Sequence, residues 1–151
     1  MPASSLPDVV RASAPVRLPG WEGRLAAVLD AARARSYVLG EHDCFRLACA
    51  AVEALTGVDH WPRWAGTYRT PRQALARIVA FGGDFQRAFS RLFGGGLQPM
   101  ARARRGDIAL YVDSGAQSHL GVVVGAQVAV LGEQGVLSCK RSECVGCWRV
   151  G

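Results

Sequence analysis

The segment Tyr37-Val38-Leu39-Gly40-Glu41-His42-Asp43-Cys44-Phe45 is the most informative part of this chain, because it places a cysteine directly behind an aspartate where a loop becomes a helix. From Asp43 to Gly57, apolar residues recur at spacings of three and four, which is typical of an amphipathic helix capped by Asp and ended by Gly. Cys44 is then expected in the first helical turn, where free amide groups and the helix dipole favour a nucleophilic thiolate. The alternative is a buried, unreactive cysteine.

Helical and strand patterns follow one another along the chain and predict an α+β domain. Apolar residues at helical spacing predict helices over residues 20–35, 43–57, 70–83 and 85–94. Short runs rich in Val, Leu and Tyr predict strands over residues 107–112, 119–124, 127–131, 136–139 and 147–150. We expect these strands to form a mostly antiparallel sheet against which the N-terminal helices pack.

Length and composition indicate one folded domain. The chain has 151 residues, of which 50% are hydrophobic, and this is enough for a core. Residues 1–19 are rich in Pro, Ser and Ala and are expected to form an extended arm, followed by a single domain over residues 20–151. We expect no secretory signal and no membrane span, because no apolar run approaches the roughly 20 residues that a spanning helix needs. The net charge of +6 is spread along the chain, so no nucleic-acid partner is expected.

A cysteine nucleophile needs a base to take its proton and a further group to orient that base. The chain has three histidines, and His119 is the one that opens a predicted strand, where a rigid backbone would hold an imidazole against the start of a packed helix. The alternative is that His119 is an ordinary polar residue at a strand edge.

The order of these motifs resembles the NlpC-type papain-like cysteine peptidases, which cleave the stem peptides of peptidoglycan. The shared pattern is Tyr-x-x-Gly, then Asp-Cys at a helix start, then Gly106-Asp107 before one strand and His-Leu-Gly-Val in the next. The resemblance implies a papain-like fold with Cys44 as nucleophile and His119 as base. It also implies that Asp43 binds the free amine of the substrate and that Tyr37 packs against the thiolate.

The chain departs from the NlpC pattern at several positions. The family has Ser-Gly after the cysteine where this chain has Phe45-Arg46, and a second glycine where it has Glu41. The family's third polar residue, which orients the base, would fall near Leu131. The substitute candidate is Gln134, which is out of register with that position. An imidazole without an orienting group samples unproductive tautomers and rotamers.

A branch of small phage proteins resembles this chain over nearly its whole length. These proteins share Tyr-x-Leu-Gly-x-x-Asp-Cys, a Thr-Gly-x-Asp helix end, a Trp-x-Gly-x-Tyr loop and a terminal Trp-Arg. The corresponding residues here are 37–44, 56–59, 64–68 and 148–149. The resemblance implies a virion protein at the tail tip of a long-tailed phage or gene transfer agent, assembled in the bacterial cytoplasm. The implied partners are peptidoglycan and other tail-tip proteins of the hub, distal-tail and central-fibre types.

A second group of cysteines lies near the C-terminus, where Cys139, Cys144 and Cys147 fall within nine residues. This spacing is that of ligands for zinc or an iron–sulfur cluster, both of which normally take four ligands. With no secretory signal, we expect these thiols to be reduced rather than paired in disulfides. The alternative is three ordinary cysteines in a terminal hairpin.

Two classes of function follow from the resemblance. The first is a tail-tip murein endopeptidase, in which the thiolate attacks an amide of the stem peptide and the acyl-enzyme is then hydrolysed. No cofactor is expected for that reaction. The second is a structural tail-tip or tail-assembly subunit that keeps the peptidase fold with little or no catalysis. A host-type amidase is a third alternative.

Overall fold

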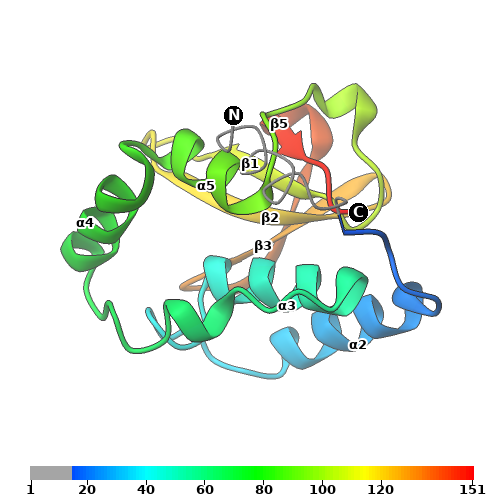
Figure 1. The fold of residues 1–151 in the computed structure, drawn as a ribbon, viewed down its shortest axis with the longest axis horizontal. Helices are drawn as coiled ribbons and strands as arrows, with labels where there is room; N and C mark the ends of the chain where they lie inside the picture. Colours follow the sequence, from blue (N-terminus) through cyan, green and yellow to red (C-terminus); the bar gives the residue numbers. More distant parts are fainter. Residues whose placement is uncertain (1–14) are drawn as a thin grey trace, which may run out of the picture.

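The computed structural model describes residues 15–151 (Figure 1). Of the expected arm, residues 1–14 lie outside the described residues, and residues 15–20 lead without regular structure into the first helix. The described helices are α2 (Trp21–Arg33), α3 (Cys44–Thr56), α4 (Pro71–Gly82) and α5 (Phe85–Phe93), with short 3-10 turns η2 (Trp61–Arg63), η3 (Met100–Arg102) and η4 (Arg141–Glu143). The strands are β1 (Ile108–Val112), β2 (Ser118–Val124), β3 (Gln127–Gly132), β4 (Gly135–Lys140) and β5 (Cys144–Trp148). Helices followed by strands confirm the predicted α+β class.

The helices α3, α4 and α5 begin at N-capping residues, and α3 and α5 end at glycines. The side chains of Asp43, Thr70 and Asp84 accept hydrogen bonds from the backbone amides three residues later and so begin α3, α4 and α5. Gly57 and Gly94 end α3 and α5 with left-handed backbone conformations, which glycine adopts without a steric penalty. None of the helices in residues 15–151 is long and apolar enough to cross a bilayer.

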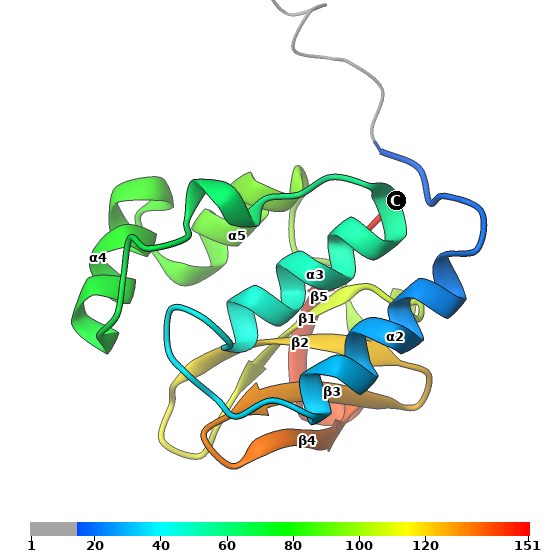
Figure 2. The same cartoon turned by 90° about the horizontal axis from the view of Figure 1, so that it is seen from below.

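The five strands form one antiparallel sheet in the order β4-β3-β2-β1-β5. Figure 2 shows α2 and α3 side by side across one face of this sheet, with α4 at the periphery of the molecule. The core between the helices and this face contains the buried side chains of Leu120 and Val122 from β2 and of Leu47 and Leu55 from α3. We call this the helix-covered face of the sheet.

The opposite face of the sheet has a small apolar cluster of its own, which we call the second cluster. It consists of the buried residues Ala109, Val123, Val128 and Val130, with Met100, Ala103, Tyr111, Cys139 and Cys144 packed against them. Strands β4 and β5 are the two edges of the sheet, yet the Sγ atoms of Cys139 and Cys144 are 3.9 Å apart. The sheet is therefore curled, and its edges meet over the second cluster.

The last strand differs from its prediction. It runs from Cys144 to Trp148 rather than over residues 147–150, so Val145-Gly146 lies inside a strand. The turn before it is η4. A Cβ atom at Gly146 would lie 2.7 Å from the carbonyl oxygen of Gln98. The glycine permits this close approach of two backbones.

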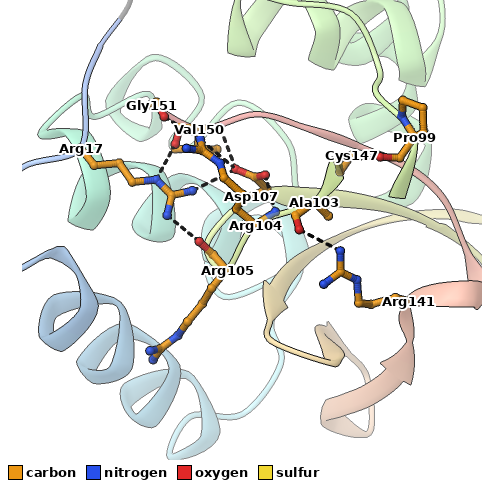
Figure 3. A network of polar contacts seen from close by, with 10 residues as sticks. All are labelled: Arg17, Pro99, Ala103, Arg104, Arg105, Asp107, Arg141, Cys147, Val150 and Gly151. Carbon is orange, nitrogen blue, oxygen red and sulfur yellow. Dashed lines mark hydrogen bonds and ion pairs between the residues drawn. The ribbon is translucent and has the colours of Figure 1, made fainter. Parts of the chain in front are cut away.

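A buried carboxylate joins the start of the described chain to its C-terminal end (Figure 3). Asp107 is 1% exposed and accepts hydrogen bonds from Arg17 Nη2 at 3.0 Å, Arg104 N at 2.8 Å and Val150 N at 3.0 Å. Arg17 also donates from Nε to the Val150 carbonyl at 2.8 Å and from Nη1 to the Arg105 carbonyl at 2.6 Å. These bonds fix both ends of the domain to the start of β1.

We predict that Asp107→Ala lowers the free energy of unfolding by about 3 to 5 kcal/mol, because it removes a buried carboxylate that accepts from the partly buried Arg17 guanidinium and from two backbone amides. Asp30→Ala is the matched control, since Asp30 forms an ion pair with Arg33 at 3.1 Å but is 79% exposed. We expect that control to change stability by less than about 1 kcal/mol. Urea unfolding of both variants measures the difference, and equal losses would contradict the role assigned to Asp107.

Candidate functional site

The carboxylate of Asp43 organises the loop that carries the candidate nucleophile. Asp43 is 2% exposed, and its Oδ1 accepts from Arg46 N at 2.8 Å. Its Oδ2 accepts from Gly40 N at 2.9 Å and from the Tyr68 hydroxyl at 2.6 Å. The resemblance implied that Asp43 binds a substrate amine; in the structure both of its oxygens accept hydrogen bonds from the fold. Tyr68 was not identified as a site residue, although it ends the Trp-x-Gly-x-Tyr loop.

Gly40 is required for this arrangement. Its φ of +86° is in the left-handed region, and a Cβ atom there would collide with the carbonyl oxygen of Tyr68. Val38 and His42 close the same loop through a pair of backbone hydrogen bonds, at 3.0 Å from Val38 N to His42 O and at 2.7 Å from His42 N to Val38 O. Backbone and side-chain contacts therefore place Cys44 rigidly at the first position of α3.

Cys44 is partly buried between the start of α3 and β2. The backbone amide of Leu120 is hydrogen-bonded to the thiol and favours a thiolate, as do the first amides of α3. Burial outweighs these donors and, with the negative charge of Asp43, raises the pKa of Cys44 to about 12. The thiol is therefore neutral at pH 7. At this helix start, desolvation outweighs the amides that would favour a thiolate.

Tyr37 lies close enough to Cys44 for the two groups to affect each other electrostatically. Burial, and then the charges of Cys44 and Asp43, raise the pKa of the Tyr37 hydroxyl to about 12. The phenol is thus neutral over the physiological range. The structure brings Tyr37, Asp43 and Cys44 together on the helix-covered side of β2.

His119 belongs to the other face of the sheet. Side chains alternate between the two faces along a strand, and Leu120 and Val122 face the helices. His119 pairs in register with Tyr111, a member of the second cluster, and the two rings lie 5.9 Å apart. Among the hydrogen bonds of residues 15–151, none joins His119 to Cys44. The structure therefore places the two on adjoining but opposite sides of β2.

Asp113 is the residue that orients His119. Its Oδ2 lies 2.8 Å from His119 Nε2, and its Oδ1 accepts from Gly115 N and Gln117 N in the turn between β1 and β2. The histidine bond, followed by these amides, lowers the pKa of Asp113. Gln134, the candidate from sequence, is instead exposed in the turn between β3 and β4. An Asp six residues before His119, in the hairpin turn, was the signal that sequence reasoning missed.

The C-terminal cysteines separate into a pair and a single residue. Cys139 and Cys144 are in contact, whereas Cys147 is 1% exposed and its Sγ lies 3.8 Å from the carbonyl oxygen of Pro99. Within residues 15–151, no group of three or more His, Cys, Asp or Glu side chains is arranged to hold a metal ion. The expected convergence of all three sulfurs on one point is therefore not observed.

Comparison with known proteins gives a family for this chain. The family model described as DUF6950, a domain of unknown function, matches residues 16–150. The chain belongs to the DUF6950 family. The matched region includes the Asp43 cap, Cys44, the His119–Asp113 pair and the C-terminal cysteines, so these features lie inside the DUF6950 domain. A search of curated proteins finds no match.

We predict that Tyr68→Phe lowers the free energy of unfolding by about 1.5 to 3 kcal/mol, because the buried Asp43 carboxylate loses a donor. Tyr37→Phe is the matched control, since among the described residues the Tyr37 hydroxyl makes no hydrogen bond to protein. We expect that control to change stability by less than about 0.5 kcal/mol. Thermal or urea unfolding distinguishes the two, and a Tyr68→Phe protein as stable as wild type would refute the organising role of the Asp43 carboxylate.

Proposed function

We propose that this DUF6950 protein is a structural subunit of a phage-like tail tip that keeps the layout of an NlpC-type peptidase without using it for catalysis. The motif resemblance over residues 37–44, 56–59, 64–68 and 148–149 supports the tail-tip assignment. The observation that carries the non-catalytic assignment is the position of His119. Its side chain packs with Tyr111 and Asp113 and belongs to the sheet face opposite α3.

The state of the nucleophile supports the same proposal. A thiol with a pKa of about 12 forms very little thiolate at pH 7, and a cysteine hydrolase overcomes this with an adjacent base. The groups around Cys44 are instead acidic or neutral: the charge of Asp43 disfavours a thiolate, and the phenol of Tyr37 is neutral. Asp43 gives its oxygens to Gly40, Arg46 and Tyr68, which serves the stability of the loop.

Murein endopeptidase activity is the second candidate, and one observation favours it. His119 directly precedes Leu120, whose amide contacts the Cys44 thiol, so a reversal of its side-chain direction would bring an imidazole towards the thiol. Catalysis would require the His119 side chain to leave Asp113 and Tyr111 and turn around the strand towards Cys44. The two candidates therefore differ in one measurable property, namely whether the reactivity of the Cys44 thiol depends on His119.

We predict that alkylation of Cys44 by iodoacetamide, followed peptide by peptide with mass spectrometry, accelerates about tenfold per pH unit between pH 6 and pH 8. This slope is that of a neutral thiol which must lose its proton before it reacts. The profile should be the same in His119→Ala. A rate that is flat across this range in wild type and becomes steep in His119→Ala would reveal a thiolate–imidazolium pair and favour the peptidase.

We further predict that purified protein releases no stem-peptide fragments from murein under reducing conditions, and that Cys44→Ala particles assemble and infect normally. Deletion of the whole gene should abolish infectious particles, because the proposed role is architectural. Fragment release that disappears in both Cys44→Ala and His119→Ala would establish the endopeptidase instead. Normal particles without the gene would exclude the structural role.

A further inference from the structure

We propose that Cys139 and Cys144 are a site of disulfide formation, in which a small-molecule disulfide such as oxidised glutathione converts the two thiols into an intramolecular bond. This inference goes beyond the proposed function and does not depend on it, because the pair lies on the sheet edges rather than beside Cys44. It assigns a chemical role to two of the three C-terminal cysteines and leaves Cys147 out.

The fold holds the two sulfurs close together. Cys139 lies near the end of β4 and Cys144 opens β5, and their Sγ atoms are 3.9 Å apart. A disulfide brings the sulfurs to about 2.05 Å. The two sulfurs must therefore approach each other by about 2 Å, and both side chains already pack on the second cluster.

The turn between the two cysteines is anchored to the rest of the domain. Arg141, in η4, donates from Nη2 to the carbonyl oxygens of Met100 and Ala103, each at 2.8 Å, and from Nη1 to Gly125 O at 3.2 Å. Figure 3 shows its contact with Ala103. Glu143 accepts from Lys140 N at 3.3 Å within the same turn. These contacts keep β4 and β5 in place, so the pair is organised before any bond forms.

Exposure and proximity together select this pair among the five cysteines. Cys49 and Cys147 are 0% and 1% exposed, whereas Cys44, Cys139 and Cys144 are partly exposed, and of these three it is Cys139 and Cys144 whose sulfurs lie in contact. A dissolved disulfide can therefore reach the pair in the folded protein. Burial raises the pKa of both thiols, but the contact with Cys144 offsets part of this rise at Cys139, whereas at Cys144, with its pKa at about 12, Cys139 adds to the rise. We therefore assign Cys139 as the attacking thiol and Cys144 as the resolving one.

The reaction is two successive thiol–disulfide exchanges. The Cys139 thiolate attacks one sulfur of oxidised glutathione, which forms a mixed disulfide and releases one glutathione thiolate. The Cys144 thiolate then attacks the Cys139 sulfur and releases the second glutathione. The protein loses two electrons and two protons, and one oxidised glutathione becomes two reduced glutathione molecules. The product closes the curled sheet covalently where its two edges meet.

The test is incubation of the full-length protein in a glutathione buffer as oxidising as the endoplasmic reticulum, then denaturation in N-ethylmaleimide and mass spectrometry. We expect wild type to take up two fewer alkyl groups than the reduced protein and to give a linked peptide containing Cys139 and Cys144. Dithiothreitol should restore all the alkylation sites. The bond should raise the melting temperature by about 5 °C, because it restricts the unfolded chain.

Three variants make the result specific. Cys147→Ser is the matched control and should lose the same two alkylation sites as wild type. Cys139→Ser and Cys144→Ser should form no internal bond, and Cys144→Ser should stop at the glutathione adduct on Cys139. Wild type that keeps all five alkylation sites, or that stops at a glutathione adduct, would overturn the proposal. A bond that involves Cys147 would overturn it equally.

Discussion

The loop that precedes α3 depends on one buried carboxylate. Asp43 begins the helix through Arg46 N, closes the preceding loop through Gly40 N and holds the following aromatic loop through the Tyr68 hydroxyl. A buried carboxylate is costly unless it is fully hydrogen-bonded, and here three donors from three segments satisfy it. The same contacts fix the position of Cys44, so the geometry of the candidate site and the stability of the helical half have a common origin.

The helices were predictable because their boundaries depend on nearby residues. Asp43, Thr70 and Asp84 each cap their helix within three residues, and Gly57 and Gly94 end two of them. The last strand was predicted to begin too late because a glycine such as Gly146 can mark either a turn or a close approach of two backbones. Only its packing against Leu97 and Gln98, which are distant in sequence, distinguishes the two.

Part of the candidate site was predictable because it, too, depends on residues that are near one another in sequence. The helix-start position of Cys44 follows from a local cap, and the strand that carries His119 follows from its composition. The face to which His119 belongs depends on its pairing with Tyr111, and a shift of one residue would reverse it. The protonation of Cys44 depends on burial by β2, which outweighs the helix dipole. Register and desolvation are both non-local, so motif spacing does not reveal them.

The position of Trp148 affects how this protein can fold during synthesis. Its ring packs against Phe89 and Phe93, its indole nitrogen donates to Ser90 Oγ at 2.9 Å, and its strand pairs with β1. On the ribosome, the helices and the first four strands emerge before this residue, so their core stays open at that point. Nascent chains arrested before residue 144 should expose apolar surface to chaperones, and release of the last strand should end that exposure.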